Sequence, residues 1–360
     1  MERIHSPGDR TAFDRKSHPT GNFTRAQLAD WLDELALAQE LFAPQVWDEV
    51  LLYRPVGSAA DLLWDFTRPV LPVKEFFFPP TERLLTIEKT GQGVRLSETL
   101  PEGRRVIFGV RPCEARGVHI LDSLFLDPEL KDPYYARRRE NTAMIGLACR
   151  TMGDTCFCTS TGSAPDDPAY VDVMLKETGE GYRVAVMTEK GRELLGDRLE
   201  ESIFPEREWT GHDPGDDASV PIAIPDPDAW PARFEDPCWE QLGERCLSCR
   251  LCAYVCPTCR CFDLRDEALA GQGNGKQFER IRCWDSCTGP AYRRIAGGHN
   301  PRGTPGQRLR NRFFCKFDYY PRQYGLASSA CTGCGRCIDV CPVNVDITEV
   351  LSQLANDLAA

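Results

Sequence analysis

The stretch CLSCRLCAYVCP occupies residues 246–257, and CTGCGRCIDVCP at residues 331–342 repeats its pattern. Both follow the order Cys-x2-Cys-x2-Cys-x3-Cys-Pro, which is the ligand pattern of 4Fe-4S ferredoxins. A cubane needs four thiolates that point at one small volume. The first three cysteines of a run wrap one cube, whereas the fourth lies beyond the turn and ligates the other cluster in two-cluster ferredoxins. The two runs therefore predict two clusters with exchanged ligands.

This exchange requires the two runs to pack together across about 75 intervening residues. The proline after each fourth cysteine stops the chain from continuing the helical turn. The main alternative is a pair of structural zinc sites, but zinc ribbons use two separated Cys-x2-Cys pairs and not two runs of four cysteines before proline. Cluster one is assigned Cys246, Cys249, Cys252 and Cys341, and cluster two is assigned Cys331, Cys334, Cys337 and Cys256.

Four cysteines of the first half of the chain lie where strands are expected to end. Loops at the carboxyl ends of strands in an α/β sheet are the usual ligand sites, so four thiols that converge there are candidates for a third 4Fe-4S cluster, ahead of zinc. The alternative is that they are buried and inert. The four are Cys113, Cys149, Cys156 and Cys158.

A further metal site is a weaker hypothesis for the region after the first run. Cys259 and Cys261 follow this run within five residues, and Cys283 and Cys287 have the spacing of one helical turn. The alternative is that these four cysteines only pack beside the clusters.

The chain has 360 residues and 18 cysteines, and its length suffices for two domains with separate cores. No stretch approaches the roughly 18 uninterrupted apolar residues of a membrane span, and the N-terminus lacks the apolar core of a secretory signal. We therefore expect a cytoplasmic protein without a membrane span. In that compartment, crowded Cys-x2-Cys runs indicate thiolate ligation of metal and not a disulfide scaffold.

The net charge of −11 is unevenly distributed. Residues 238–360 carry 16 Lys and Arg against 12 Asp and Glu, whereas the remainder carries 27 against 42. An oxidised 4Fe-4S unit with its four thiolates carries about two negative charges, so two units would bring the C-terminal region near neutrality. Arg250, Arg260 and Arg336 lie within or beside the runs, where positive charge favours the reduced clusters. Nucleic acid is not an expected partner, because no RNA-binding or helix-turn-helix pattern is present.

Composition divides the chain into four segments. Residues 1–23 are polar and contain Pro and Gly, and are expected to be a mobile N-terminal segment. Residues 24–208 alternate strand and helix signals, which predicts an α/β domain with a candidate extra cluster and a surface for subunit docking. Residues 209–231 are acidic and Pro-rich and predict a linker. Residues 232–360 predict an α+β dicluster ferredoxin-like domain with a long insertion between its motifs.

Hydrophobic periodicity predicts the elements of the α/β domain. A helix is expected to begin after Thr24, which forms a capping-box pattern with Gln27. Two further strands are expected to be joined across residues 178–181. The other expected strands are 46–53, 104–110 and 143–149, and the other expected helices are 58–66, 114–126 and 189–201.

Seven motifs together carry a resemblance to a known family: VRPCE (110–114), DPYYARRREN (132–141), CFCTS (156–160), CPTCRCFD (256–263), WDSC (284–287), GGHNPR (297–302) and CPVNVD (341–346). They resemble the beta subunit of cytoplasmic NAD(P)-linked nickel–iron hydrogenases, or sulfhydrogenases, and are equally similar to the corresponding iron–sulfur subunit of anaerobic sulfite reductase. The resemblance runs from about Thr24 to the C-terminus. Cys283 and Cys315 depart from the family pattern.

This resemblance implies a non-catalytic electron-transfer subunit of an anaerobic oxidoreductase complex, with 4Fe-4S clusters as its cofactors. Flavin and NAD(P) are expected on one partner subunit, and a catalytic subunit of the hydrogenase or sulfite/sulfur reductase type is the other expected partner. One alternative is an electron-transfer subunit of a flavin oxidoreductase coupled to heterodisulfide reductase. Another is an enzyme whose α/β domain itself binds substrate or flavin.

Overall fold

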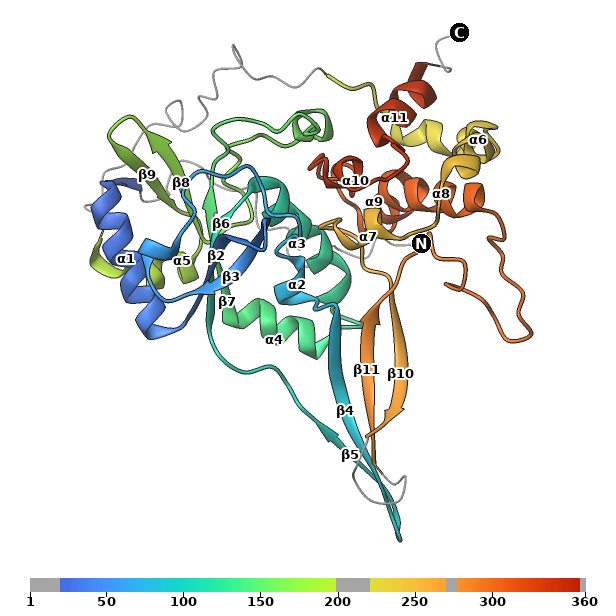
Figure 1. Cartoon of the computed structure of the whole chain (residues 1–360), viewed down its shortest axis with the longest axis horizontal. Helices are drawn as coiled ribbons and strands as arrows, with labels where there is room; N and C mark the ends of the chain where they lie inside the picture. The colour runs from blue at the N-terminus through green and yellow to red at the C-terminus, as the bar shows by residue number, and fades with distance from the viewer. Residues whose placement is uncertain (1–19, 199–220, 270–276, 357–360) are drawn as a thin grey trace.

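The computed structural model describes residues 20–198, 221–269 and 277–356. Most of the expected mobile N-terminal segment, and the first part of the expected linker at 209–231, therefore lie outside the described residues. The described chain forms a mixed α/β part followed by a cysteine-rich helical part (Figure 1). No described helix combines the length and the apolar character that crossing a membrane requires.

A seven-stranded sheet with the order β1-β9-β8-β7-β6-β2-β3 forms the centre of the α/β part. The strands β8, β7, β6 and β2 are parallel to one another, and the pairings toward both edges, of β9 with β8, β1 with β9 and β3 with β2, are antiparallel. The strands are β1 (Thr20–Phe23), β2 (Glu40–Trp47), β3 (Val50–Val56), β6 (Arg105–Val110), β7 (Thr142–Leu147), β8 (Val173–Thr178) and β9 (Gly181–Val186).

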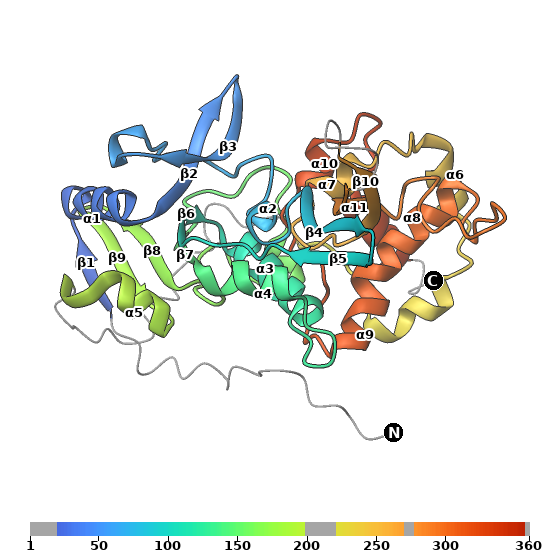
Figure 2. The same cartoon turned by 90° about the horizontal axis from the view of Figure 1, so that it is seen from below.

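Helices cover both faces of this sheet, because its central strands bury side chains on both sides. On β6, Val106 and Phe108 join the core on the α1 face, whereas Ile107 and Val110 join the core under α3. Figure 2 shows α1 to the left of β6 and β7 and α3 and α4 to their right, and Leu195 of α5 joins the core on the α1 face. These helices are α1 (Arg25–Ala38), α3 (Pro112–Phe125), α4 (Pro133–Asn141) and α5 (Glu189–Leu195), with short helical pieces at Ala59–Asp61, Lys74–Phe77 (α2), Cys158–Thr161 and Gly196–Arg198.

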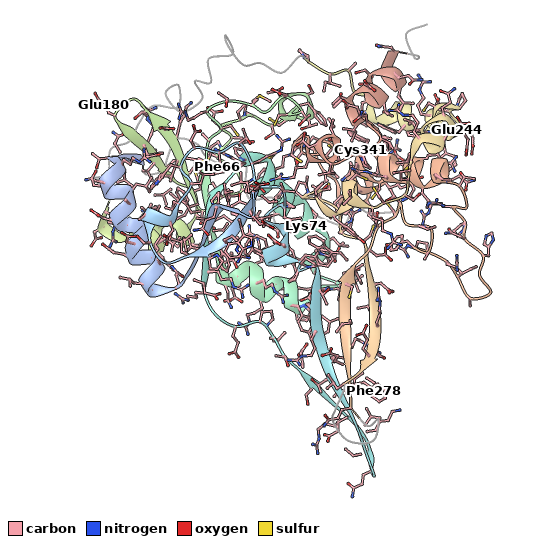
Figure 3. The ribbon with its side chains drawn as sticks, viewed as in Figure 1. Phe66, Lys74, Glu180, Glu244, Phe278 and Cys341 are labelled. Carbon is pink, nitrogen blue, oxygen red and sulfur yellow. The ribbon has the colours of Figure 1, made fainter. Side chains whose placement is uncertain are left out.

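A second sheet, with the order β10-β11-β4-β5, projects from the body as an antiparallel arm (Figure 1). Its two hairpins come from distant parts of the sequence, since β11 pairs with β4 from Gln277 opposite Glu88 to Cys283 opposite Thr81. Figure 3 shows Phe278 far along this arm and Cys341 among the C-terminal helices. The strands are β4 (Thr81–Thr90), β5 (Gly93–Glu98), β10 (Phe262–Ala268) and β11 (Gln277–Trp284).

The cysteine-rich part is built from short helices around a core that contains Trp230, Trp239, Phe314 and Leu351. The amphipathic α8 is capped by Thr304, whose hydroxyl oxygen accepts from the amide of Gln307. The helices are Pro227–Arg233 (3-10), α6 (Cys238–Arg245), α7 (Leu251–Tyr254), α8 (Pro305–Phe314), a π-helical turn at Cys315–Tyr319, α9 (Tyr320–Tyr324), α10 (Arg336–Asp339) and α11 (Ile347–Asn356).

Most of the predicted elements of the α/β part are confirmed, including the capping box of Thr24 and Gln27. Two predictions are wrong. The expected strand at 46–53 is a hairpin that turns at Asp48 and Glu49, whose φ angles of 49° and 64° suit a type I′ turn. Residues 58–66 were expected to form a helix, but only Ala59–Asp61 form one 3-10 turn. The apolar residues that follow, such as Leu62 and Phe66, reach the core from irregular backbone.

A buried ion pair joins the two parts of the chain. Glu114, in the first turn of α3, is 0% exposed and accepts from Arg336 of α10, which is 2% exposed, at 2.7 Å. Tyr53 donates its hydroxyl to the same carboxylate at 2.5 Å, and Arg336 also donates to the carbonyl of Pro69 at 2.9 Å. The pair fixes α3 against the second cysteine run.

We predict that Arg336→Ala lowers the free energy of unfolding by roughly 3–5 kcal/mol, because it leaves the Glu114 carboxylate buried without its counter-charge. The matched control is Arg95→Ala, which removes an exposed ion pair with Glu88 and should change stability far less. Anaerobic denaturant unfolding, followed by tryptophan fluorescence at matched iron content, measures both variants. Equal losses in the two variants would contradict the prediction.

Candidate iron–sulfur centres

The two cysteine runs fold into loops of the same shape. Ser248 and Arg250 of the first run have positive φ angles of 53° and 72°, and Gly333 and Gly335 at the equivalent places of the second have 64° and 74°. Glycine is required only in the second run. A Cβ at Gly333 would lie 2.5 Å from the backbone nitrogen of Cys158, and one at Gly335 would lie 2.3 Å from the carbonyl oxygen of Thr155.

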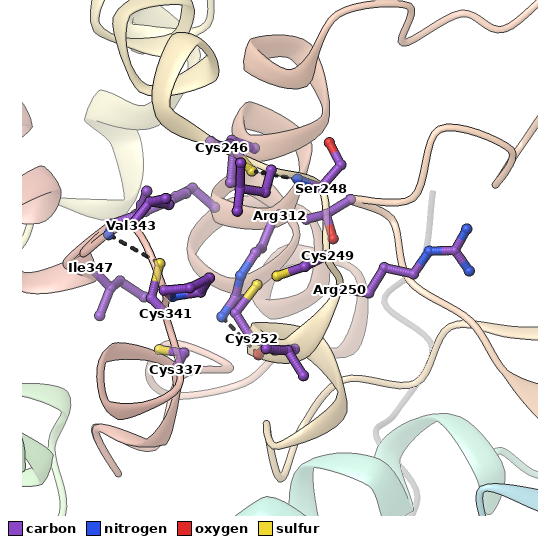
Figure 4. A pocket seen from close by; sticks show the side chains of 17 residues that line it. Cys246, Ser248, Cys249, Arg250, Cys252, Arg312, Cys337, Cys341, Val343 and Ile347 are labelled. Atoms are coloured by element: carbon purple, nitrogen blue, oxygen red, sulfur yellow. Dashed lines mark hydrogen bonds between the residues drawn. The ribbon is translucent and has the colours of Figure 1, made fainter.

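The first pocket is lined by Cys246, Cys249 and Cys252 of the first run and by Cys341 of the second (Figure 4). Backbone amides face two of these sulfurs: Ser248 N–H donates to Cys246 at 3.4 Å, and Val345 N–H donates to Cys341 at 3.1 Å. The structure thus brings together the four cysteines assigned to cluster one. Amide donors to sulfur are the usual second layer around a ligated cluster.

Arg312 of α8 also lines this pocket. Its Nη2 donates to the carbonyl of Cys252 at 3.1 Å, while its buried Nη1 has no hydrogen-bond partner among the described residues. Burial alone would lower the pKa of Arg312, but the Cys252 and Cys337 thiolates outweigh burial and raise it. An unpaired, charged donor beside four thiols fits an anionic cluster with exposed sulfides.

Lys316 lies beside two cysteines of the second group, Cys256 and Cys331. The Lys316 ammonium group donates to the sulfur of Cys256 at 3.0 Å and to the hydroxyl of Thr258 at 2.8 Å. Burial raises the pKa of Cys331, the Lys316 charge opposes this rise, and the Cys256 and Cys334 thiolates add to it. Burial likewise raises the pKa of Cys337, and the Cys334, Cys331 and Cys256 thiolates add to that rise. The four cysteines assigned to cluster two are therefore electrostatic neighbours.

The third group lies where the α/β sheet meets the second run. Cys113 lies in the first turn of α3, directly after β6, and Cys149 follows β7. The pocket formed there is lined by Cys113, Cys149, Cys156 and Cys158, with Cys334 of the second run in its wall. Arg68 donates to the Cys156 sulfur at 2.9 Å. The four cysteines expected at the carboxyl ends of strands thus share one pocket.

The structure separates Cys283 from Cys259, Cys261 and Cys287. Cys283 lies in strand β11, where its sulfur accepts from the Thr81 hydroxyl at 3.8 Å. The expectation of helical spacing between residues 283 and 287 is wrong, because residue 283 belongs to a strand, in which successive side chains alternate between two faces. Cys315, for which the sequence suggested no site, lies near the other three instead.

The cations at these centres are only partly those expected. Of the arginines predicted to favour reduced clusters, Arg260 donates to the sulfur of Cys315 at 3.4 Å, whereas Arg336 is paired with Glu114 and Arg250 with Asp285, at 3.2 Å. The charges that reach cysteine sulfurs of the three groups come instead from Lys316 and Arg68. Sequence reasoning missed both, because neither lies in a cysteine run, and only the fold brings them to the sulfurs.

Within residues 20–198, 221–269 and 277–356, no three His, Cys, Asp or Glu side chains are grouped as a single metal ion requires. A zinc ion holds its sulfurs at about 2.3 Å, which forces them close to one another. In a cubane each thiolate ligates its own iron, so the four sulfurs lie further apart. Two of the pockets are each lined by all four cysteines of one assigned group, which is the number of thiolates that a cubane requires.

Comparisons with known proteins agree with this geometry. Residues 245–345 match the family model described as a 4Fe-4S dicluster domain. The chain is 31% identical over 341 residues to sulfhydrogenase 2 subunit beta of Pyrococcus furiosus, covering 91% of this chain and 96% of that protein. No solved structure matches the chain. A dicluster domain in a relative of hydrogenase subunits supports an electron-transfer role within a multi-subunit complex, and the chain belongs to the family of sulfhydrogenase beta subunits.

Proposed function

We propose that this chain is the electron-transfer subunit that connects a flavin- and NAD(P)-binding subunit with a catalytic subunit of the hydrogenase or sulfite/sulfur reductase type. The observation that carries the proposal is the first pocket, in which Cys341 of the second run lies with three cysteines of the first. A 4Fe-4S cluster takes up and returns one electron with little rearrangement. Exchanged ligands make the two runs one unit, which holds both clusters at fixed separation.

The candidate centres form a continuous row, which suits a relay. Cys337, a proposed ligand of cluster two, also lines the first pocket. Cys334, another proposed ligand of cluster two, also lines the pocket of the third group. Cluster two would therefore lie between cluster one and a third cluster held by Cys113, Cys149, Cys156 and Cys158. A row of this kind provides an entry point and an exit point for electrons at opposite ends.

Buried cations are proposed to set the potentials of these centres. Lys316 is 4% exposed and contacts the sulfur of Cys256, so water screens its charge little. Burial alone would lower the pKa of Lys316, but the Cys256 and Cys259 thiolates raise it, and the side chain is a cation. A fixed positive charge at a ligand sulfur stabilises the more negative, reduced state.

We predict that Cys341→Ser disrupts the cluster held by the first run and leaves the cluster of the second run intact. Cys256→Ser should do the reverse, because each fourth cysteine serves the other run. Each variant should lose up to about four iron atoms per chain, read from iron analysis and from the EPR spectra of the reduced protein. Cys283→Ser, which alters a cysteine outside all these groups, is the control. Loss of the cluster held by the altered cysteine's own run would refute the exchange.

We predict that Lys316→Met lowers the reduction potential of cluster two. A unit charge about 5 Å away contributes about 3 kcal/mol at an effective dielectric constant of 20, so the shift should be on the order of 100 mV. The measurement is a redox titration followed by EPR. Lys131→Met removes an exposed lysine, whose charge water screens, and should leave every potential unchanged. Equal shifts of the reduction potential in both variants would contradict the proposed role of Lys316.

The function itself is tested by anaerobic purification of the native chain from its source. We expect a flavin-containing subunit to co-purify together with a catalytic oxidoreductase subunit, and we expect the iron of this chain to become reduced when the partner's nicotinamide substrate is added. The EPR signals of the reduced clusters report this step. A chain that purifies alone with fewer than about eight iron atoms, and without such signals, contradicts the proposal.

A further inference from the structure

Four cysteines outside the three groups above are brought together by segments that are distant in sequence: Cys259, Cys261, Cys287 and Cys315. The base of the β10–β11 hairpin joins the first three. Phe262 pairs with Trp284 there, and the Asp285 amide donates to the Cys261 carbonyl at 2.9 Å. Cys261 and Cys287 therefore lie just outside the two ends of the hairpin. The Cys261 thiol is an electrostatic neighbour of Cys287, and Cys287 is in turn a neighbour of Cys259 and Cys315.

Cys315 reaches this hairpin base from the helical layer. It begins the π-helical turn Cys315–Tyr319, and the Arg260 guanidinium group donates to its sulfur at 3.4 Å. The same guanidinium group lies 3.4 Å from the centre of the Tyr320 ring, which holds it in place. Turns of π-helix inside α-helices are frequent at functional sites. Here the turn presents Cys315 to this group and the next residue, Lys316, to Cys256.

The surroundings of these thiols are positively charged and largely buried. The Lys74 ammonium group donates to the carbonyl of Cys259 at 3.1 Å and lies 3.7 Å from the centre of the Trp284 ring. Lys74 and Arg260 therefore place two positively charged groups beside these thiols.

We propose that Cys259, Cys261, Cys287 and Cys315 ligate a further 4Fe-4S cluster. A set of four thiolates selects soft metals. Arg260 and Lys74 supply positive charge beside it, as Arg312 and Lys316 do at the other centres. The Cys259 amide donates to the Cys256 carbonyl at 3.4 Å, so the site adjoins the second cluster.

This site lies beside the proposed row of centres, next to Cys256. The proposal does not depend on which subunits the relay connects. Cys315 is the ligand that distinguishes the site from the sequence-based hypothesis. The spacing of Cys283 and Cys287 favoured Cys283, but the strand carries Cys283 to Thr81.

The first test is alkylation of the wild-type holoprotein with iodoacetamide under anaerobic conditions, mapped by peptide mass spectrometry. Cys315 and Cys283 are both partly exposed, so they form a matched pair. We expect Cys283 to react while Cys315 is protected, and Cys315 to become reactive after iron is removed with a chelator. Equal reactivity of the two cysteines in the loaded protein would overturn the proposal.

The second test is metal analysis of Cys315→Ala and Cys287→Ala with Cys283→Ala as the control. Each of the first two should lose about four iron atoms per chain, or convert one cluster to a three-iron form visible by EPR, while the control loses none. Retention of all iron, or zinc in place of iron in the wild-type protein at this site, overturns the proposal. The signals of clusters one and two should persist in these variants, whereas failure of the relay proposal would appear in Cys341→Ser and Cys256→Ser.

Discussion

The buried pair of Glu114 and Arg336 is the constraint on which the arrangement of the centres depends. Glu114 follows Cys113 directly, and Arg336 lies between Cys334 and Cys337, so one ion pair positions proposed ligands of two different groups. Breaking such a pair leaves an unpaired charge in the protein interior, which solvates it poorly. The carboxylate also accepts a hydrogen bond from Tyr53 of strand β3. The same carboxylate therefore joins the sheet to α3 and to the second run. The sheet, α3 and the second run are therefore fixed as one body.

The same reasoning applies to the cations that face the cysteines. Arg312 and Lys316 are buried, and their hydrogen bonds within the described chain go to a carbonyl, a sulfur and a hydroxyl instead of a carboxylate. Charges of this kind are costly in an apolar interior unless opposite charge is close by. Thiolates, and the cluster anions that we propose they hold, would supply that charge. Folding of the C-terminal part and binding of its clusters should therefore be coupled, as they are in other small metal-binding domains.

The sequence predicted what local patterns can determine. The spacing of the cysteine runs identified the eight proposed ligands, and the capping residues Thr24 and Gln27 located the first helix. Local patterns failed where contacts between residues distant in sequence determine the position of a side chain or the type of element. Lys316 lies 60 residues after Cys256 and has no motif of its own. Cys283 was assigned by helical spacing, although pairing with β4 makes it part of a strand.

The α/β part has a hydrophobic core of its own and also forms one side of the proposed cluster-binding region. Gly117 of α3 packs on Pro257, the proline that ends the first run, so closely that a Cβ would lie 2.6 Å from the proline side chain. The pocket of the third group takes four cysteines from the α/β part and Cys334 from the second run. Strand β11, from the segment between the runs, pairs with β4 of the first half. A bare ferredoxin would need none of these contacts. The proposed third cluster would extend the row of centres into the α/β part, and so would give that part a role in electron transfer as well as in docking.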